Sequence, residues 1–269
     1  MTVNKRPGFK SKYPRKGSGG IHKKVEKEQP DITGLIRLNK FIANAGIASR
    51  READRLIVSG IIKVNGKVVT DLGVKVSPDD KIQFEDRTIV SERKVYVLLN
   101  KPKGYITTTD DPMDRKTVMM LLKNAGRERI YPVGRLDRDT TGVLLLTNDG
   151  DLAKKLTHPR YRIQKIYHVV LDKNIKVGDL HKIAAGIELE DGFIKPDVID
   201  YVQNADSKKE VGIEIHSGKN RVIRRLFESL DFKVTKLDRV SFAGLTKKDV
   251  PRGKWRFLNE KEIAFLKMK

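Results

Sequence analysis

Cysteine is absent from this chain of 269 residues, and histidine occurs only five times. The lack of cysteine excludes disulfides, thiol nucleophiles and thiolate metal sites, and it is compatible with a reducing cytoplasm. The histidines also lack the i, i+4 spacing and the neighbouring ligands typical of zinc sites. They are His22, His158, His168, His181 and His216. The sequence therefore predicts no metal site, and nothing in it indicates a cofactor.

Long apolar runs are also missing. No stretch approaches the roughly 20 apolar residues that span a bilayer, and no apolar segment follows the basic residues near the N-terminus as in a signal peptide. We therefore expect a cytoplasmic protein that is neither exported nor inserted in a membrane. Hydrophobic residues still make up 38% of the chain. At this length they suffice for the cores of about two domains.

Negative charge is scarce relative to positive charge. The chain has 56 Lys and Arg residues against 35 Asp and Glu residues, a formal net charge of +21 at pH 7. A soluble polycation binds phosphate backbones, so the composition indicates a nucleic-acid partner. Residues 1–24 hold eight basic side chains and no acidic one. We predict that residues 1–33 form a disordered, phosphate-binding basic arm, because a transit peptide would show amphipathic periodicity that this segment lacks.

Residues 34–91 carry the pattern of a small folded unit. Apolar positions repeat at helical spacing up to Gly46, and Ser49 followed by Glu52 predicts the capping box of a second helix. An Asn65-Gly66 turn between two apolar segments then predicts a β-hairpin. The order helix, helix, hairpin, with basic side chains along it, resembles the S4 RNA-binding domain.

Residues 94–269 form the predicted second domain, behind a charged connector at residues 83–94. Strands are predicted at 95–99, 143–146, 167–171, 211–215 and 255–258 and near Val234, and helices at 151–157, 178–185 and 221–230. Strands and helices are intermixed without regular alternation, so the predicted fold class is α+β rather than doubly wound.

The most informative segment is residues 131–150. Asp137 lies beside Arg135 and Arg138 on a loop bounded by glycines. Positive neighbours keep a carboxylate ionised, the state that a nucleophile or a base requires. The apolar run 143–146, closed by an Asn-Asp-Gly turn, predicts a core strand that anchors this loop. A surface cluster of ion pairs explains the same residues on spacing alone, so the pattern by itself leaves both interpretations open.

Three segments, in order, resemble one known family. Gly-Arg-Leu-Asp at 134–137, followed by Thr-Gly-Val-Leu-Leu-Leu-Thr-Asn-Asp-Gly at 141–150, is similar to the catalytic signature of the pseudouridine synthases that modify ribosomal RNA. Residues 98–105 and 218–227 are similar to two further blocks of the branch that carries an S4-like domain. The resemblance covers residue 34 to the C-terminus. It implies a mixed, mostly antiparallel sheet with an active-site cleft across its middle.

The resemblance also implies three catalytic residues. Asp137 attacks the target uridine, either by adding to the sugar or by abstracting its 2′ proton, and the sequence leaves both routes open. Tyr167 stacks on the flipped base and assists proton removal at C5, while Arg224 pairs with Asp137 and keeps it ionised. Asp139 is a rival, but the signature places the catalyst at Asp137. Val222 departs from the family, where Gln is common, so a polar contact is missing or supplied elsewhere.

Further residues are predicted to contact RNA. In the S4-like unit the resemblance places the start of the second helix on RNA phosphates, and the larger domain adds basic side chains from its motifs. The set is Arg37, Ser49, Arg50, Arg51, Lys101, Arg135, Arg138, Lys219, Arg221 and Arg225. A solvated surface is the alternative interpretation of these side chains.

The resulting prediction is a monomeric enzyme that converts a uridine of ribosomal RNA, or of a pre-ribosomal particle, to pseudouridine. The motifs are most similar to the large-subunit, B-type branch. A uridine must leave its stack to reach Asp137, so we expect a locally unpaired RNA segment as substrate. Two alternatives remain. The first is an rRNA-binding assembly factor without catalysis, which would not need the three catalytic residues together. The second is a Mg²⁺-dependent nuclease, but the arginines around Asp137 disfavour the binding of a cation.

Overall fold

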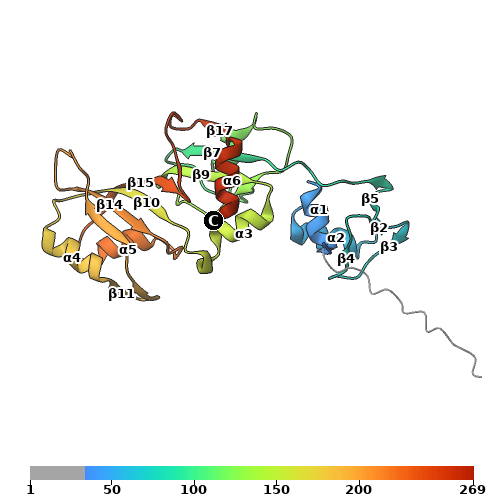
Figure 1. Ribbon diagram of the computed structural model, residues 1–269, viewed down its shortest axis with the longest axis horizontal. Helices are drawn as coiled ribbons and strands as arrows, with labels where there is room; N and C mark the ends of the chain where they lie inside the picture. The colour runs from blue at the N-terminus through green and yellow to red at the C-terminus, as the bar shows by residue number, and fades with distance from the viewer. Residues whose placement is uncertain (1–33) are drawn as a thin grey trace, which may run out of the picture.

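The computed structural model describes residues 34–269, so the predicted basic arm at residues 1–33 lies outside the described residues. Two units follow one another along the chain, and Figure 1 shows the smaller N-terminal unit to one side of the larger one. No helix within residues 34–269 combines the length and the apolar character needed to cross a membrane.

The N-terminal unit has the predicted order of two helices and a hairpin. Ser49 and Glu52 form the capping box at the start of the second helix, and Asn65 and Gly66 both have positive φ at the hairpin turn, as an Asn-Gly turn requires. A small core that includes Leu38 and Ile62 joins the helices to the strands. The elements are β1 (Ile36–Arg37), α1 (Leu38–Asn44), α2 (Arg50–Val58), β2 (Ile62–Val64), β3 (Lys67–Val68), β4 (Lys75–Val76), β5 (Ile82–Phe84) and β6 (Arg87–Thr88).

The segment predicted as a charged connector, residues 83–94, begins as a second hairpin. β5 pairs with both β2 and β6, which gives a four-stranded sheet in the order β3-β2-β5-β6. Glu85 and Asp86 form its turn, both with positive φ, and Ile82 is buried in the core. The connector prediction is therefore wrong for residues 83–88, because the charged residues belong to an exposed turn between two strands.

A nine-stranded sheet forms the centre of the larger unit. Its order is β13-β14-β10-β15-β9-β7-β17, with β8 and β16 attached to β9 and β15. Within the described residues, its strands pair antiparallel except for β9 with β15. The strands are β7 (Tyr96–Lys101), β8 (Tyr131–Pro132), β9 (Thr141–Thr147), β10 (Lys165–Leu171), β13 (Val198–Tyr201), β14 (Glu210–Ile215), β15 (Val234–Phe242), β16 (Leu245–Thr246) and β17 (Trp255–Phe257). The predicted α+β class and the mixed, mostly antiparallel sheet are confirmed.

The sheet is covered on both faces. In β7, Val97 and Leu99 belong to one hydrophobic cluster and Tyr96 and Leu98 to another, which explains why this strand is apolar at every position rather than at alternate ones. Figure 1 shows α4 and α5 beside β14 and β10, and α3 and α6 beside β7 and β9. The remaining elements are α3 (Gly150–Thr157), α4 (Val177–Ala185), α5 (Val222–Glu228), α6 (Glu260–Met268), the 3-10 turns η1 (Val118–Leu122) and η2 (Pro159–Tyr161), and the hairpin of β11 (Ile187–Leu189) and β12 (Gly192–Ile194).

Gly142 allows the parallel contact between β9 and β15. It is paired with Arg239 across the two strands, it has a φ of +108°, and a Cβ at this position would overlap the backbone of Arg239. Glycine alone tolerates both the conformation and the close approach. The contact brings the loop before β9 against β15 and its neighbour β10, at the middle of the sheet.

Candidate active site

Asp137 lies on the loop that enters β9. The neighbouring Leu136 is buried, and its backbone N and O atoms both bond to the hydroxyl of Thr107, at 3.3 and 2.8 Å. On the other side, the backbone oxygen of Asp137 accepts from the N–H of Thr140 at 3.1 Å. The carboxylate itself is 36% exposed. The loop is thus anchored at both ends while its acid remains accessible.

A buried cation lies beneath this loop. Lys101, the last residue of β7, is fully buried, and its ammonium donates to the backbone oxygens of Thr140 at 2.9 Å and Asp137 at 3.0 Å. The oxygens of Pro102 and Arg138 lie at 3.3 Å. Burial lowers the pKa of Lys101 to about 8, against the opposing effect of nearby carboxylates. The prediction of Lys101 as an RNA-binding residue is therefore wrong, because its side chain is enclosed and holds the loop of Asp137.

The cation that approaches the Asp137 carboxylate is Arg221. Its Nη1 lies 4.0 Å from Oδ2 of Asp137, and the residue precedes α5 with a φ of 46°. Arg224 lies on the buried side of α5, where its Nη1 donates to the backbone oxygen of Val234 at 2.8 Å. The predicted pair of Arg224 with Asp137 is therefore wrong in this structure. Because the helix begins at Val222, position 224 lies in the core while position 221 stays outside, within reach of the loop.

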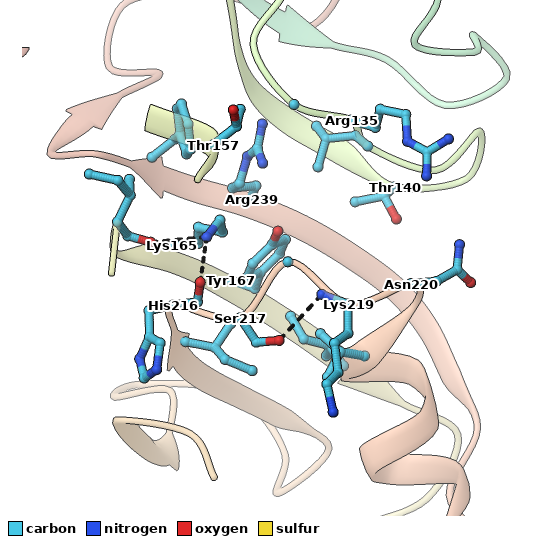
Figure 2. A pocket seen from close by; sticks show the side chains of 18 of the residues that line it. Arg135, Thr140, Thr157, Lys165, Tyr167, His216, Ser217, Lys219, Asn220 and Arg239 are labelled. Carbon is cyan, nitrogen blue, oxygen red and sulfur yellow. Dashed lines mark hydrogen bonds between the residues drawn. The ribbon is translucent and has the colours of Figure 1, made fainter. Parts of the chain in front are cut away.

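A cavity of about 290 Å³ adjoins Asp137, near the lower limit for sites that bind small organic ligands. Tyr167, predicted as a site residue, lies in its wall: it is 9% exposed and is paired with Arg239 of the neighbouring strand β15. Figure 2 shows Tyr167 in the middle of this cavity with Arg239 and Lys165 beside it. The structure thus brings Asp137, Tyr167 and Arg221 to one cavity, which Arg224 does not line.

Two cations of the cavity were not predicted as site residues. Arg239 is 2% exposed; its Nε donates to the backbone oxygen of Val143 at 2.8 Å, and its Nη2 is buried without a hydrogen-bond partner in the described chain. Lys165 donates to the backbone oxygens of Ile163 and His216. Burial, and then the charge of Arg239, lower the pKa of Lys165 to about 8.

The sequence does contain a signal for Arg239. Within β15, Arg239 lies two residues after Leu237 and two before Ser241, so the three side chains share one face of the strand, and all three are buried. A cation on the buried phase of a strand is unusual and points to a special environment. The cavity also holds a hydroxyl without a partner among the described residues, that of Thr140, which is buried.

Some of the residues predicted to contact RNA are engaged in contacts within the protein, and others are exposed. Ser49 caps α2, since its hydroxyl accepts from the Glu52 N–H at 3.2 Å. Lys219 lines the cavity and donates to the backbone oxygen of Asp191, and Arg225 pairs with the Asp191 carboxylate at 2.9 Å. Both hold the β11–β12 hairpin beside the site. The exposed members are Arg37, Arg50, Arg51, Arg135, Arg138 and Arg221.

Metal ligands do not gather at this site. Within residues 34–269, no three His, Asp or Glu side chains come together in a way that could hold an ion. The charged groups around the cavity are instead mostly cations, which suits an anionic ligand.

Comparison with known proteins gives a consistent result. Residues 95–229 match the family described as RNA pseudouridylate synthase, and residues 36–82 match the S4 domain. A Bacillus subtilis (strain 168) protein named ribosomal large subunit pseudouridine synthase B is 46% identical over 237 residues, covering 87% of this chain and 96% of that protein. An uncharacterized RNA pseudouridine synthase of Aquifex aeolicus (strain VF5) is 42% identical over 233 residues, covering 86% of this chain and 93% of its own length. A crystal structure of a pseudouridylate synthase superposes with a TM-score of 0.62 at 31% identity, covering 86% of this chain and 99% of that one.

Proposed function

Because the chain belongs to the RNA pseudouridylate synthase family, we propose that it isomerises a specific uridine of large-subunit ribosomal RNA to pseudouridine, with Asp137 as the reacting group. One observation carries the proposal: the Asp137 carboxylate lies on an anchored loop at a cavity of about 290 Å³, 4.0 Å from the guanidinium of Arg221. An exposed carboxylate held in this way can act as a nucleophile or a base.

The reaction needs no external donor. The bond between C1′ of the sugar and N1 of uracil breaks, and the base turns while it remains bound. Its C5 then bonds to C1′ and loses a proton, while N1 gains one. Asp137 either adds to C1′ or removes the 2′ proton. Both routes require an ionised carboxylate next to the sugar and a cavity that retains the free base.

The substrate uridine has to leave its stack before it can enter this cavity. Extrusion costs a few kcal/mol, and it costs least where the nucleotide is already unpaired. Tyr167 provides an aromatic surface on which the extruded base stacks. Its hydroxyl is a candidate for proton transfer at C5.

RNA binding divides between the two units. The exposed Arg37, Arg50 and Arg51 of the N-terminal unit contact phosphates and set the register on the RNA, while Arg135 and Arg138 bind the backbone near the target. Lys219 and Arg225 act chiefly through the β11–β12 hairpin that they hold. We assign the large subunit because the relative with that name covers most of this chain. We further propose that the protein works as a monomer in the cytoplasm.

Deletion of the gene tests this function. Pseudouridines are mapped across both ribosomal RNAs in cells with and without it, and the deletion strain is complemented with wild type, Asp137→Asn or the matched control Asp139→Asn. We expect one position in large-subunit rRNA to lose its pseudouridine, and wild type and Asp139→Asn to restore it. An unchanged pseudouridine map would contradict the function, and loss from the small subunit alone would contradict the assigned target.

A further inference from the structure

Arg239 is placed in a way that its own fold does not explain. Its Nε bond to Val143 and the stacking of its guanidinium 4.6 Å from the centre of the Phe242 ring fix its position. The buried Nη2 still has no partner in the described residues. A buried guanidinium with an unused donor is costly unless a ligand supplies an acceptor. Arg239 lines the cavity next to Tyr167, so a ligand of the cavity is the natural source.

Lys165 adds a second positive charge at the same end of the cavity. Figure 2 shows it beside Arg239, with the ring of Tyr167 next to both. Within residues 34–269, neither cation forms an ion pair; the nearby carboxylate of Asp197 pairs with His216 and Arg162 instead. Two neighbouring cations that form no ion pair repel each other, and a bound negative charge relieves that repulsion.

We propose that Arg239 and Lys165 form a cationic subsite that binds a carbonyl oxygen of the extruded uracil and stabilises the negative charge of the base after it leaves the sugar. The inference rests on the proposed function. When the C1′–N1 bond breaks, both electrons pass to N1, and the charge spreads over N1, O2 and O4. When C5 then attacks C1′, these electrons form the new bond; C5 loses its proton and N1 takes one up, so the net change is an isomerisation. The cations act between these two events, when the base is an anion.

The surroundings of the subsite favour the base over a phosphate group. Arg239 is 2% exposed, whereas Arg221 near Asp137 is 48% exposed. Apolar side chains line the cavity together with the two cations, among them Ile163 and Phe242. A flat base fits such a half-apolar recess, while the phosphates of a continuous RNA strand remain at the surface, where the exposed arginines lie.

The first experiment removes each charge in turn. Arg239→Gln and Lys165→Met are compared with Lys236→Gln, which removes an exposed cation from the same strand β15. Uridine consumption is measured in single turnover at saturating RNA, and RNA affinity and thermal stability are measured in parallel. We expect Arg239→Gln to lose about 100-fold in rate, as for removal of one donor to a developing anion, with unchanged affinity. Arg239→Lys should recover part of the loss, and Lys236→Gln should match wild type.

The second experiment alters the leaving base. A loss of charge stabilisation depends on the base, whereas a structural defect slows the reaction equally with either base. An RNA with 5-fluorouridine at the target position releases a base that carries negative charge more readily. The penalty of Arg239→Gln should then shrink to about 10-fold or less, because less stabilisation is needed. Lys165→Met should show the same trend, which keeps the test valid if Arg239→Gln does not fold.

A third RNA, with uncharged methylphosphonates on both sides of the target, shows whether the subsite binds an oxygen of the uracil base or an oxygen of a backbone phosphate. The penalty should persist in this RNA if the subsite binds the base, and its disappearance would assign the subsite to phosphate and overturn the proposal. Equal penalties on uridine and 5-fluorouridine would overturn it as well. A wild-type protein that forms no pseudouridine in any of these RNAs would instead contradict the proposed function.

Discussion

Replacement of Lys101 by Met tests whether a buried ammonium holds the Asp137 loop. The substitution keeps the volume of the side chain but removes the ammonium from which the backbone oxygens of Asp137 and Thr140 accept hydrogen bonds at 3.0 and 2.9 Å. Each bond from a charged donor contributes about 1.5–3 kcal/mol. Burial of the charge offsets part of this, as the lowered pKa of Lys101 shows. We expect a net loss of about 3 kcal/mol in the free energy of unfolding.

The same substitution should impair the reaction without weakening RNA binding. A displacement of about 1 Å in a reacting group costs about 100-fold in rate, whereas a buried side chain makes no contact with RNA. The assays are urea unfolding, single-turnover pseudouridine formation and RNA affinity, with the exposed Lys103→Met as control. If Lys101→Met lost less than about 1 kcal/mol of stability and kept the wild-type rate, the loop-holding role would be refuted.

The remaining predictions concern the sheet centre and the cavity. Gly142→Ala should destabilise the protein by about 3 kcal/mol in thermal unfolding, because the added Cβ meets the Arg239 backbone. The control Gly73→Ala, also at positive φ but with open space around it, should cost about 1 kcal/mol. Equal losses would contradict the close approach of β9 and β15 as the reason for glycine at position 142. Tyr167→Phe should slow pseudouridine formation more than uridine consumption, and wild-type rates would limit Tyr167 to stacking. Lys165 has a pKa of about 8 in the fold against 10.5 in a free lysine, so the rate should fall as the pH rises above about 8. Lys165→Arg, which stays charged, should show a smaller fall, because Lys101, whose pKa is also about 8, still titrates in that range. An identical alkaline loss of rate in Lys165→Arg would reject the titration of Lys165 as the cause of that loss. Because Lys165 in the unfolded chain keeps its proton to higher pH than in the fold, its titration should also raise the free energy of unfolding between pH 8 and 10.5.

Local sequence signals predicted much of the fold. The capping box at Ser49 and the Asn65-Gly66 turn act over a few residues, so they are visible without tertiary context. α6 was not predicted, although Asn259 and Glu262 form a capping box at its start. Only Leu266 of this helix is buried, so its apolar periodicity is weak. The strands β5 and β6 were missed because the charges of their turn dominate a short segment.

The candidate site was predictable where a motif places a residue on a loop or strand. The motifs indicated Asp137 and Tyr167, and the structure brings both to one cavity. Motif spacing did not show which arginine of the 221–225 segment turns inward, because that depends on where α5 begins. The roles of Lys101 and Arg239 depend on contacts between strands distant in the sequence, such as the bond from Arg239 to Val143. The motifs assigned Lys101 to RNA contact and did not indicate Arg239.

The most direct test of the central claim is a comparison of wild type with Asp137→Asn on purified large-subunit rRNA. Asn keeps the size and the polarity of the side chain but has no negative charge, so the loop and the surrounding arginines should be preserved. Pseudouridine is mapped after incubation at saturating protein, and RNA affinity is measured in the same buffer. We expect wild type to form pseudouridine at one position, and Asp137→Asn to bind with equal affinity and form none. Pseudouridine formation by Asp137→Asn at the wild-type rate would contradict the assignment of Asp137 as the reacting group.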